Sequence, residues 1–406
     1  MISKETVYQT IKNSIKIYQD SNFQIIIGIT LITILGGPGI SPLLPSIAKD
    51  LNIPPEHIGW VISAFFIPIT IGTPISGILA DRYGRKQILI PALFLFAIAG
   101  ALCSLAPNFR TLIEFRFIQG IGATPIESLT LTLISDLYRG KLLTTAMAFR
   151  TMSIGLSLVI YPLVSGGLTT WGWRYPFLLY LIAIPLSFWV LFCLKIPAMP
   201  KQKSFSLKIY LRNIWQSLNN YQVGCLLIVI IINFILTFGP CLTYIPLFAN
   251  RQLGASYIVI GIILASRGIF LAFISSQLGI FAKYLSEITL IKVSFILYCI
   301  ACMITPTINN IWLLFIPGIL SGLAQGMVAP SSQSLLGQLS PEKYRAGFMA
   351  VTATALSFGQ TLGPILAGTM FTIGGMAGVF YSSAILSLII FVFISYLVIN
   401  TPSIKS

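Results

Sequence analysis

The sequence predicts an all-α integral membrane protein with twelve transmembrane helices in two pseudo-symmetric bundles of six. Three observations carry this prediction: the composition, the recurrence of long apolar runs, and a repeat at half the chain length. Of the 406 residues, 56% are hydrophobic and only 9% are charged, whereas a typical soluble domain has roughly 25% charged residues. Lipid, rather than water, is therefore the main solvent of the folded chain.

Apolar runs of about 20 residues recur along the whole chain, and each is long enough as a helix to cross a hydrocarbon core of about 30 Å. A β-barrel would need alternating segments of about 10 residues instead of continuous apolar runs. The polar opening stretch, 1–21, lacks the apolar core of a cleaved signal, so we expect the first span to stay as an anchor. We expect spans at 23–46, 57–80, 87–106, 111–135, 144–168, 174–195, 222–248, 255–282, 288–307, 311–338, 346–372 and 376–399.

The basic residues fall in alternate loops. If the N-terminus is cytoplasmic, the cytoplasmic segments hold 17 Lys and Arg residues and the opposite loops hold four. The positive-inside rule then predicts an inner-membrane protein with both termini in the cytoplasm. Because this placement and the attraction to anionic lipid account for the net charge of +15, the expected partner is the bilayer and not nucleic acid.

The cysteines and the single histidine offer little chemistry. All six cysteines lie in or beside spans, so we expect free thiols that pack as small apolar residues. Cys299 and Cys302 have CxxC spacing, but they lie in an apolar helix without a second pair or a neighbouring His. His57 falls in an outer loop, and no nucleotide-binding GxxxxGK motif is present. We therefore expect no metal site and no cofactor.

The second half of the chain repeats the first. A basic polar stretch from Pro197 to Gln222 separates the sixth span from the seventh. Because Gly and Pro set close helix approach and kinks, their recurrence predicts two six-helix bundles, 1–196 and 222–406, joined by a cytoplasmic linker, 197–221. A shift of 202 residues places Gly77 on Gly279, Ala80 on Ala282, Gly120 on Gly322, Ala148 on Ala350, Pro162 on Pro364 and Gly166 on Gly368.

The loop between the second and third spans carries the most specific motif. It reads Gly77-Ile78-Leu79-Ala80-Asp81-Arg82-Tyr83-Gly84-Arg85-Lys86 and resembles the GxLaDrxGrkxxl signature of the major facilitator superfamily. The resemblance covers essentially the whole chain and implies the fold of that family. It also implies a conformational latch, formed by Gly77, Asp81, Arg82, Gly84, Arg85 and Lys86, in which Asp81 meets the positive N-terminal end of the eleventh helix. A plain positive-inside loop would explain the basic residues but not the acid and the two glycines.

Three further segments resemble this family. In the fourth span, Arg116-Phe117-Ile118-Gln119-Gly120-Ile121-Gly122-Ala123 resembles the family's RxxqGxga signature. Two others resemble its drug/proton antiporter branch: Gly172-Trp173-Arg174 after the fifth span and Gly359-Gln360-Thr361-Leu362-Gly363-Pro364 in the eleventh. The sequence departs from this branch at Tyr161 and Ser165, which replace glycines of a GPxxGG run, and in having no acid within the first span.

Charged residues inside spans are costly and mark functional candidates. Of the ten acids, Glu127 lies well inside a span, and we interpret it as a proton carrier in a charge relay with Arg116 and Arg150. The fourth and fifth spans form a hairpin that places Glu127 and Arg150 at similar depth, which predicts an ion pair. Either protonation of Glu127 releases Arg150 and shifts the transport cycle, or the pair is a permanent structural bridge.

Arg267, in the eighth span, has no acid at matching depth except Glu127, so it is either a second partner or an anchor for a substrate anion. Polar residues on the helices that line the cavity by family analogy complete the substrate-binding candidates: Gln119, Asn233, Tyr244, Gln325 and Gln360. Each of these could bind a ligand or only a neighbouring helix.

The sequence therefore predicts a secondary active transporter that works by alternating access, with a small-molecule substrate and protons as the coupling ion. The leading hypothesis is a monomeric exporter of small amphiphilic drugs or metabolites. An organic-anion transporter or an uncoupled facilitator of the same fold is the alternative. A membrane-embedded transferase is a remote one, because it would need clustered His, Asp or Glu residues at an interface. We do not expect an enzyme.

Overall fold

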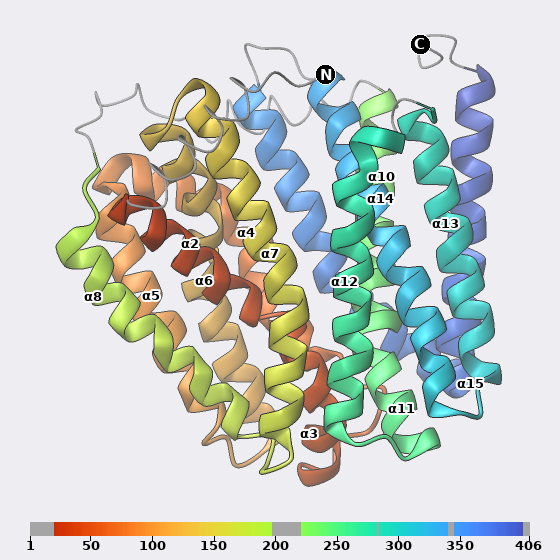
Figure 1. Cartoon of the computed structure of the whole chain (residues 1–406). Helices are drawn as coiled ribbons and strands as arrows, with labels where there is room; N and C mark the ends of the chain where they lie inside the picture. The colour runs from red at the N-terminus through yellow and green to blue at the C-terminus, as the bar shows by residue number, and fades with distance from the viewer. Residues whose placement is uncertain (1–19, 197–220, 282–283, 340–344, 401–406) are drawn as a thin grey trace, which may run out of the picture.

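The structure, a computed structural model, describes residues 20–196, 221–281, 284–339 and 345–400 (Figure 1). The expected linker at 197–221 therefore lies almost wholly outside the described residues. The regular structure of these ranges is helical, because their long apolar runs satisfy every backbone group within one segment.

The first half of the chain contains α2 and the helices that follow it up to α8. Polar side chains cap the helices where the chain enters the apolar region, as where Asp20 Oδ1 accepts from the backbone N–H of Asn22 (2.9 Å) at the start of α2. The elements are α2 (Ser21–Leu35), η1 (Pro38–Leu43), α3 (Leu44–Asp50), α4 (Trp60–Tyr83), α5 (Arg85–Cys103), α6 (Phe109–Leu137), α7 (Gly140–Thr169), η2 (Tyr175–Ile182) and α8 (Ala183–Cys193).

The second half contains α10 to α15. Its elements are α10 (Tyr221–Leu236), the π-helix η3 (Thr237–Tyr244), α11 (Ile245–Leu253), α12 (Tyr257–Phe281), α13 (Glu287–Ile304), η4 (Thr305–Thr307), η5 (Ile311–Leu314), α14 (Phe315–Leu339) and α15 (Arg345–Asn400). α15 holds two spans, since its backbone leaves the helical region at Gly374 and Gly375.

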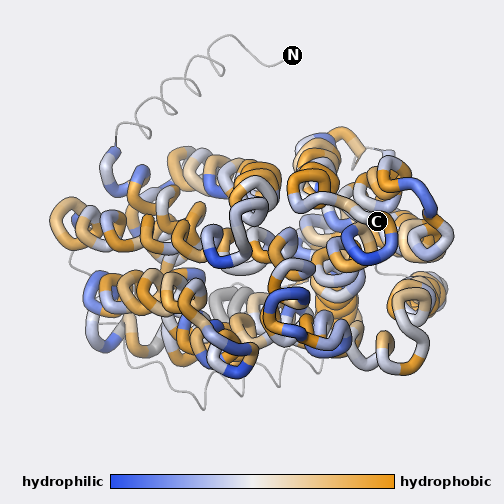
Figure 2. The backbone as a smooth tube through the Cα atoms, turned by 90° about the horizontal axis from the view of Figure 1, so that it is seen from below, coloured by the Kyte–Doolittle hydropathy of each residue, from blue (hydrophilic) through white to orange (hydrophobic). Residues whose placement is uncertain are grey.

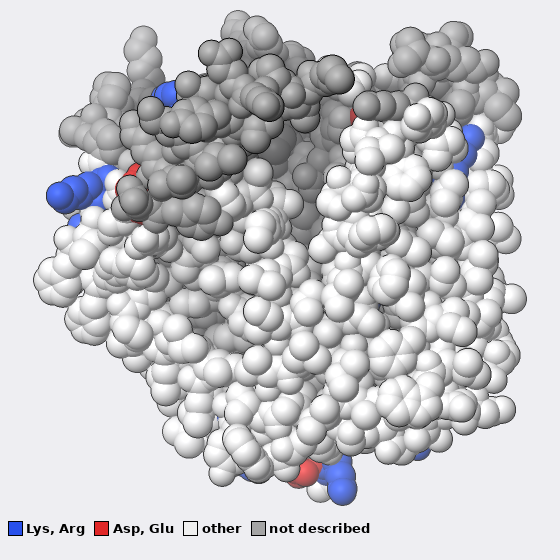
Figure 3. Space-filling model, viewed as in Figure 1, with Lys and Arg blue, Asp and Glu red and all other residues white. Residues whose placement is uncertain are grey.

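Within the described residues, ten helical segments are long and apolar enough to cross a membrane. One of them, Val351–Tyr396, holds the two spans of α15, and α4 adds the shorter apolar helix Trp60–Thr73. The twelve predicted spans are thus all present as helices. Figure 2 shows hydrophobic residues along most of the tube, and Figure 3 shows charged side chains only towards the two ends of the visible surface.

The two halves lie beside each other in Figure 1, with α2 to α8 on one side and α10 to α15 on the other. We call the face with the Gly84 turn between α4 and α5 the basic face, and the face with α3 and α11 the opposite face. Near the opposite face the halves meet through two matching backbone contacts. A Cβ added to Gly59 would lie 2.6 Å from the carbonyl oxygen of Pro364, and one added to Gly261 would lie 2.5 Å from that of Pro162.

These contacts follow the repeat read from the sequence, because Gly59 and Pro162 are each related to Gly261 and Pro364 by the same shift of 202 residues. We call this boundary between the two halves the seam. Side chains also cross it, since Ser63 Oγ donates to the carbonyl oxygen of Thr361 (2.7 Å). Glycine at these points lets helix backbones approach more closely than any side chain would permit.

Towards the basic face the packing is open. A Cβ added to Gly77 in α4, to Gly279 in α12 or to Gly337 in α14 would meet nothing within 4 Å. The contacts between the halves given above thus lie near the opposite face, whereas Gly77, Gly279 and Gly337 have open space beside them.

Candidate functional site

Arg116, in α6, is fully buried among helices of the first half. Its Nη2 donates to the carbonyl oxygen of Gly36 (2.7 Å), its Nε to that of Val61 (3.0 Å), and its Nη1 to Gln119 Oε1 (2.7 Å). The guanidinium also lies over the ring of Phe65, 4.4 Å from its centroid, an arrangement that favours a cation. Arg116 thus ties together the end of α2, α4 and α6, with Gln119 as one of its acceptors.

Glu127 and Arg150 lie apart from the Arg116 cluster. Glu127 in α6 and Arg150 in α7 are both half-buried, and their charges act on each other. Within the described part of the chain no direct salt bridge joins them, and the buried Nε of Arg150 has no hydrogen-bond partner. The ion pair expected from the sequence is not formed in this conformation.

The reason is that α6 and α7 do not form a packed hairpin. α6 packs mainly on α4 and α5, whereas α7 packs mainly on α12 and α2. The two helices diverge, so side chains at similar depth do not come into direct contact. The result is a half-buried carboxylate and a half-buried guanidinium that interact at longer range, an arrangement in which adding or removing one proton changes the force between two helices.

The second half contains its own polar cluster around Arg267, which is 3% exposed. Its Nη2 donates to Gln325 Oε1 (2.5 Å) and to Thr237 Oγ1 (3.5 Å). Thr237 is in turn 3.0 Å from the hydroxyl of Tyr298, which donates to Asn233 Oδ1 (3.1 Å). Three of the predicted candidates, Asn233, Arg267 and Gln325, thus belong to one hydrogen-bonded network.

The π-helix η3 shapes this cluster. π-helical turns are rare and often lie at functional sites, and here Pro240 falls inside the turn. The segment begins with Thr237, which joins the Arg267 network, and ends with Tyr244, whose hydroxyl donates to the carbonyl oxygen of Pro55 (3.0 Å) in the first half. One irregular segment therefore links the buried network to the closed opposite face.

The remaining candidate, Gln360 in α15, is 8% exposed, and its Oε1 is buried without a hydrogen-bond partner. No described hydrogen bond joins it to the Arg267 network. The six substrate-binding candidates thus separate into four places: the Arg267 network, the Arg116 cluster with Gln119, the Pro55 contact of Tyr244, and Gln360. Their roles in substrate binding stay predictions.

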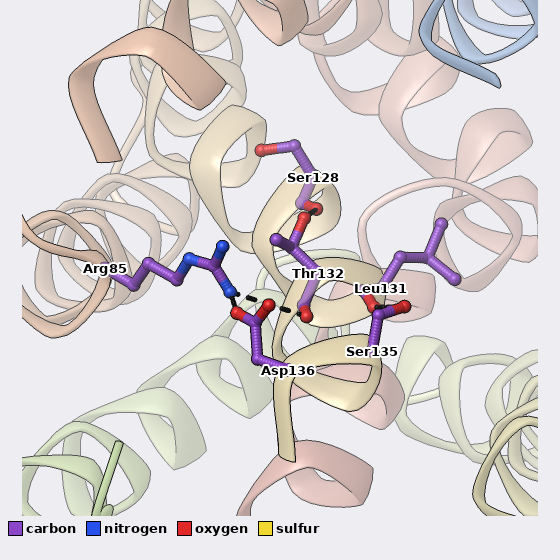
Figure 4. Close-up of polar contacts among 6 residues, drawn as sticks. All are labelled: Arg85, Ser128, Leu131, Thr132, Ser135 and Asp136. Atoms are coloured by element: carbon purple, nitrogen blue, oxygen red, sulfur yellow. Dashed lines mark hydrogen bonds and ion pairs between the residues drawn. The ribbon is translucent and has the colours of Figure 1, made fainter. Parts of the chain in front are cut away.

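The basic turn is built as the motif suggests. Gly84 has φ +98°, a conformation that glycine adopts without strain, and it joins α4 directly to α5. Figure 4 shows Arg85, from the start of α5, directed at Asp136 near the end of α6, with which it forms an ion pair. Lys86 Nζ donates to the carbonyl oxygen of Leu194 (3.1 Å), and Arg82 is exposed.

The side chain of Asp81 lies outside the described part of the structure, as do those of residues 345–350 at the start of the eleventh span. The expected contact between Asp81 and that helix therefore stays a prediction. What the structure adds is that Arg85 braces the third span against the fourth through Asp136, inside the first half.

The sequence interpretation missed three residues of these clusters. Thr237 and Tyr298 were passed over because a lone hydroxyl in an apolar span resembles packing, and Asp136 because it lies near a predicted interface. The repeat offered a signal for Asp136, because the shift of 202 residues places the pair Arg85 and Asp136 on another polar pair, Glu287 and Gln338. In the structure Glu287 and Gln338 are also in contact, with Gln338 Nε2 donating to Glu287 Oε1 (3.5 Å).

Comparison with known proteins agrees with this architecture. The chain is 30% identical to the multidrug export protein EmrB of Haemophilus influenzae over 161 residues, and 33% identical to the niacin transporter NiaP of Acinetobacter baylyi over 145 residues. These matches cover 39% and 34% of the chain but only 31% and 32% of the two relatives. The quinolone resistance protein NorA of Staphylococcus aureus is 24% identical, over 86% of the chain and 88% of NorA.

Solved structures share the fold. The nucleoside transporter NupG superposes with a TM-score of 0.76 at 17% identity, over 94% of the chain and 100% of NupG. A D-xylose–proton symporter gives 0.74 at 17% identity, over 95% and 98% of the two chains. Since the family model of the Major Facilitator Superfamily matches residues 26–291 and 226–406, this multi-pass membrane protein, a transporter and not an enzyme, belongs to the major facilitator superfamily.

Proposed function

We propose that the protein is a proton-coupled exporter of small amphiphilic molecules in the inner membrane. The observation that carries this proposal is Glu127, a half-buried acid inside a span that interacts with Arg150 without a direct salt bridge. A carboxylate in such a place gains or loses a proton with a large change in local electrostatics. The similarity to EmrB and NorA supports efflux as the direction of transport.

The cycle we propose uses both halves as rigid bodies. With the basic face in the cytoplasm, as the 17-to-4 distribution of basic residues favours, the conformation described here is open to the cell interior. Cargo enters from the cytoplasm, and the Gly59 and Gly261 contacts part when the halves rock to the outward-open state. Proton binding to Glu127 from outside weakens its attraction to Arg150 and so favours return to the inward-open state.

The test is transport by the purified protein in lipid vesicles with an imposed pH gradient. A fluorescent quinolone, nicotinate and ethidium serve as probes, and movement of at least one probe is expected to follow the gradient. Glu127→Gln is expected to abolish this gradient response, because glutamine has the same shape but carries no proton that it can release. Glu114→Gln is the matched control, since Glu114 lies on the same helix but pairs with Arg110 at the exposed surface.

Movement that follows the gradient equally in the Glu127→Gln variant would overturn the assignment of the proton carrier. Movement of the probes that ignores the gradient in the unmodified protein would support a facilitator instead.

A further inference from the structure

The hydrogen bonds around Arg267 have a single direction. Tyr298 gives its one hydroxyl proton to Asn233 Oδ1, so Thr237 donates to the Tyr298 oxygen and accepts from Arg267. With its oxygen engaged, Asn233 is left with its amide nitrogen, Nδ2, which is buried and has no partner. The network thus starts at a cation and ends at a free donor.

Arg267 itself also keeps a free donor. Its Nε is buried without a hydrogen-bond partner, while Nη2 is bonded to Gln325 Oε1. Nε and Nη2 lie on one edge of the guanidinium, where two parallel N–H groups match the two oxygens of a carboxylate. The single oxygen of Gln325 fills half of this edge and leaves the other half empty.

Arg267 has no acidic partner among the residues that the structure describes. The side-chain ion pairs in these ranges are Arg85–Asp136 and Arg110–Glu114, and neither involves Arg267. Burying a guanidinium without an anion carries a desolvation penalty that hydrogen bonds to neutral partners do not fully offset. Its hydrogen-bond partners, Gln325 and Thr237, are neutral side chains and do not supply this anion.

The cluster lies beside the boundary between the two halves. The next residue, Gly268, lies on the seam between the halves, since its added Cβ would be 2.7 Å from the carbonyl oxygen of Leu158 in α7. Gln325, which is bonded to the Nε–Nη2 edge of the Arg267 guanidinium, is only half-buried. Displacing one flexible amide side chain, or parting α7 from α12, therefore opens the guanidinium edge.

From this geometry we propose that the Arg267 network is a receptor for the carboxylate of an amphiphilic cargo, with Nε and Nη2 of Arg267 as the fork and Asn233 Nδ2 as a third donor. The inference rests on the proposed transport function and names the class of cargo, organic carboxylates. The carboxylate replaces Gln325 as the partner of Arg267, and the apolar part of the cargo lies against the surrounding helices.

The experiment compares matched pairs of probes that differ only in charge: nicotinate against nicotinamide, and a quinolone carboxylic acid against its methyl ester. Binding is measured by calorimetry on the purified protein in detergent. We expect at least one acid to bind about 10- to 100-fold more tightly than its neutral partner. Arg267→Gln is expected to reduce this preference to less than about threefold, mainly by weakening the binding of the acid.

Two further variants sharpen the result. Arg267→Lys keeps the charge but not the fork, so it should keep only part of the preference. Asn233→Ala removes the third donor and should reduce the preference severalfold even if Arg267 variants fold poorly. Arg251→Gln is the matched control, because it removes one positive charge from an exposed position in α11.

The proposal is overturned if no acid binds better than its neutral partner, or if Arg267→Gln keeps the full preference. The proposed function is tested separately by the gradient response of the unmodified protein and of Glu127→Gln. A lost carboxylate preference with an intact gradient response therefore rejects the receptor alone. An intact preference without a gradient response rejects proton coupling alone.

Discussion

Arg116 and Arg267 occupy equivalent places in the two halves of the molecule. The backbone of Gly120 packs against the carbonyl oxygen of Phe65, and that of Gly322 against the carbonyl oxygen of Arg267. The shift of 202 residues relates both pairs, so Arg267 stands where the first half has Phe65, the ring on which Arg116 lies. Each bundle thus buries one guanidinium at the same place, although the two come from different spans.

Their partners differ in kind. Arg116 uses Nε, Nη1 and Nη2 for two backbone carbonyls and a glutamine, whereas Arg267 leaves Nε free and bonds only to neutral side chains. Backbone carbonyls are fixed by the helices, but side chains can turn away. Arg116, with Nε, Nη1 and Nη2 all used, is held as a tie between helices, whereas Arg267 keeps the free donor that the proposed carboxylate site requires.

The largest expected effect on stability comes from removing Arg116, whose side chain joins α2, α4 and α6. Arg116→Met should lower the free energy of unfolding by about 3–5 kcal/mol, because the carbonyls of Gly36 and Val61 lose their donor in a buried place. Arg267→Met should cost far less stability. The measurement is the thermal unfolding midpoint of both variants in the same detergent, and equal losses would remove the distinction between the two arginines.

The second effect concerns the symmetric seam. Gly59→Ala and Gly261→Ala should each disfavour the conformation described here by about 1–3 kcal/mol, since a methyl group would meet a backbone carbonyl. Spin labels at the exposed positions Lys49 and Arg251 should then report a larger separation at the opposite face. Gly279→Ala, in open space, is the control. A shift for one glycine and none for the other would show that the halves do not contribute equally to closure.

The smallest expected effect is a difference in stability between two equivalent polar contacts at the basic face, Arg85–Asp136 and Glu287–Gln338. Asp136→Asn should destabilise the protein by about 1–2 kcal/mol, because it removes the charge opposite a largely buried Arg85. Gln338→Ala, at the equivalent position of the second half, should change stability by less than about 0.5 kcal/mol, since its contact is long and exposed. The thermal unfolding midpoints of the two variants test this. A larger drop in the midpoint for Gln338→Ala would show that the contact in the second half is the stronger one.

The fold followed from the sequence because bilayer thickness fixes span length, and because Gly120, Pro162 and Gly166 recur 202 residues later as Gly322, Pro364 and Gly368. Span ends were predicted to within a few residues for the same reason. The Glu127–Arg150 contact was expected from a hairpin, but adjacent spans in this fold need not pack on each other, and the sequence does not contain that information.

The Arg267 network could be predicted only in part. The sequence identifies Arg267 as a charged residue that is costly to place inside a span. Which of its N–H donors stay free depends on the π-helical turn at Thr237–Tyr244, an irregularity that local sequence does not specify. The bonds of Arg116 to the carbonyl oxygens of Gly36 and Val61 could likewise not be read from the sequence. The predicted place of Arg116 in a charge relay stays a prediction.

We propose a division of labour between the halves, in which Glu127 of the first half carries the proton and Arg267 of the second half takes the cargo anion. The most direct measurement is transport of nicotinate, nicotinamide, the quinolone acid and its methyl ester in vesicles, with and without a pH gradient, by Glu127→Gln and Arg267→Gln side by side. We expect Glu127→Gln to lose the gradient response but keep the carboxylate preference, and Arg267→Gln to lose the preference but keep the gradient response. Loss of both properties in either variant would contradict it.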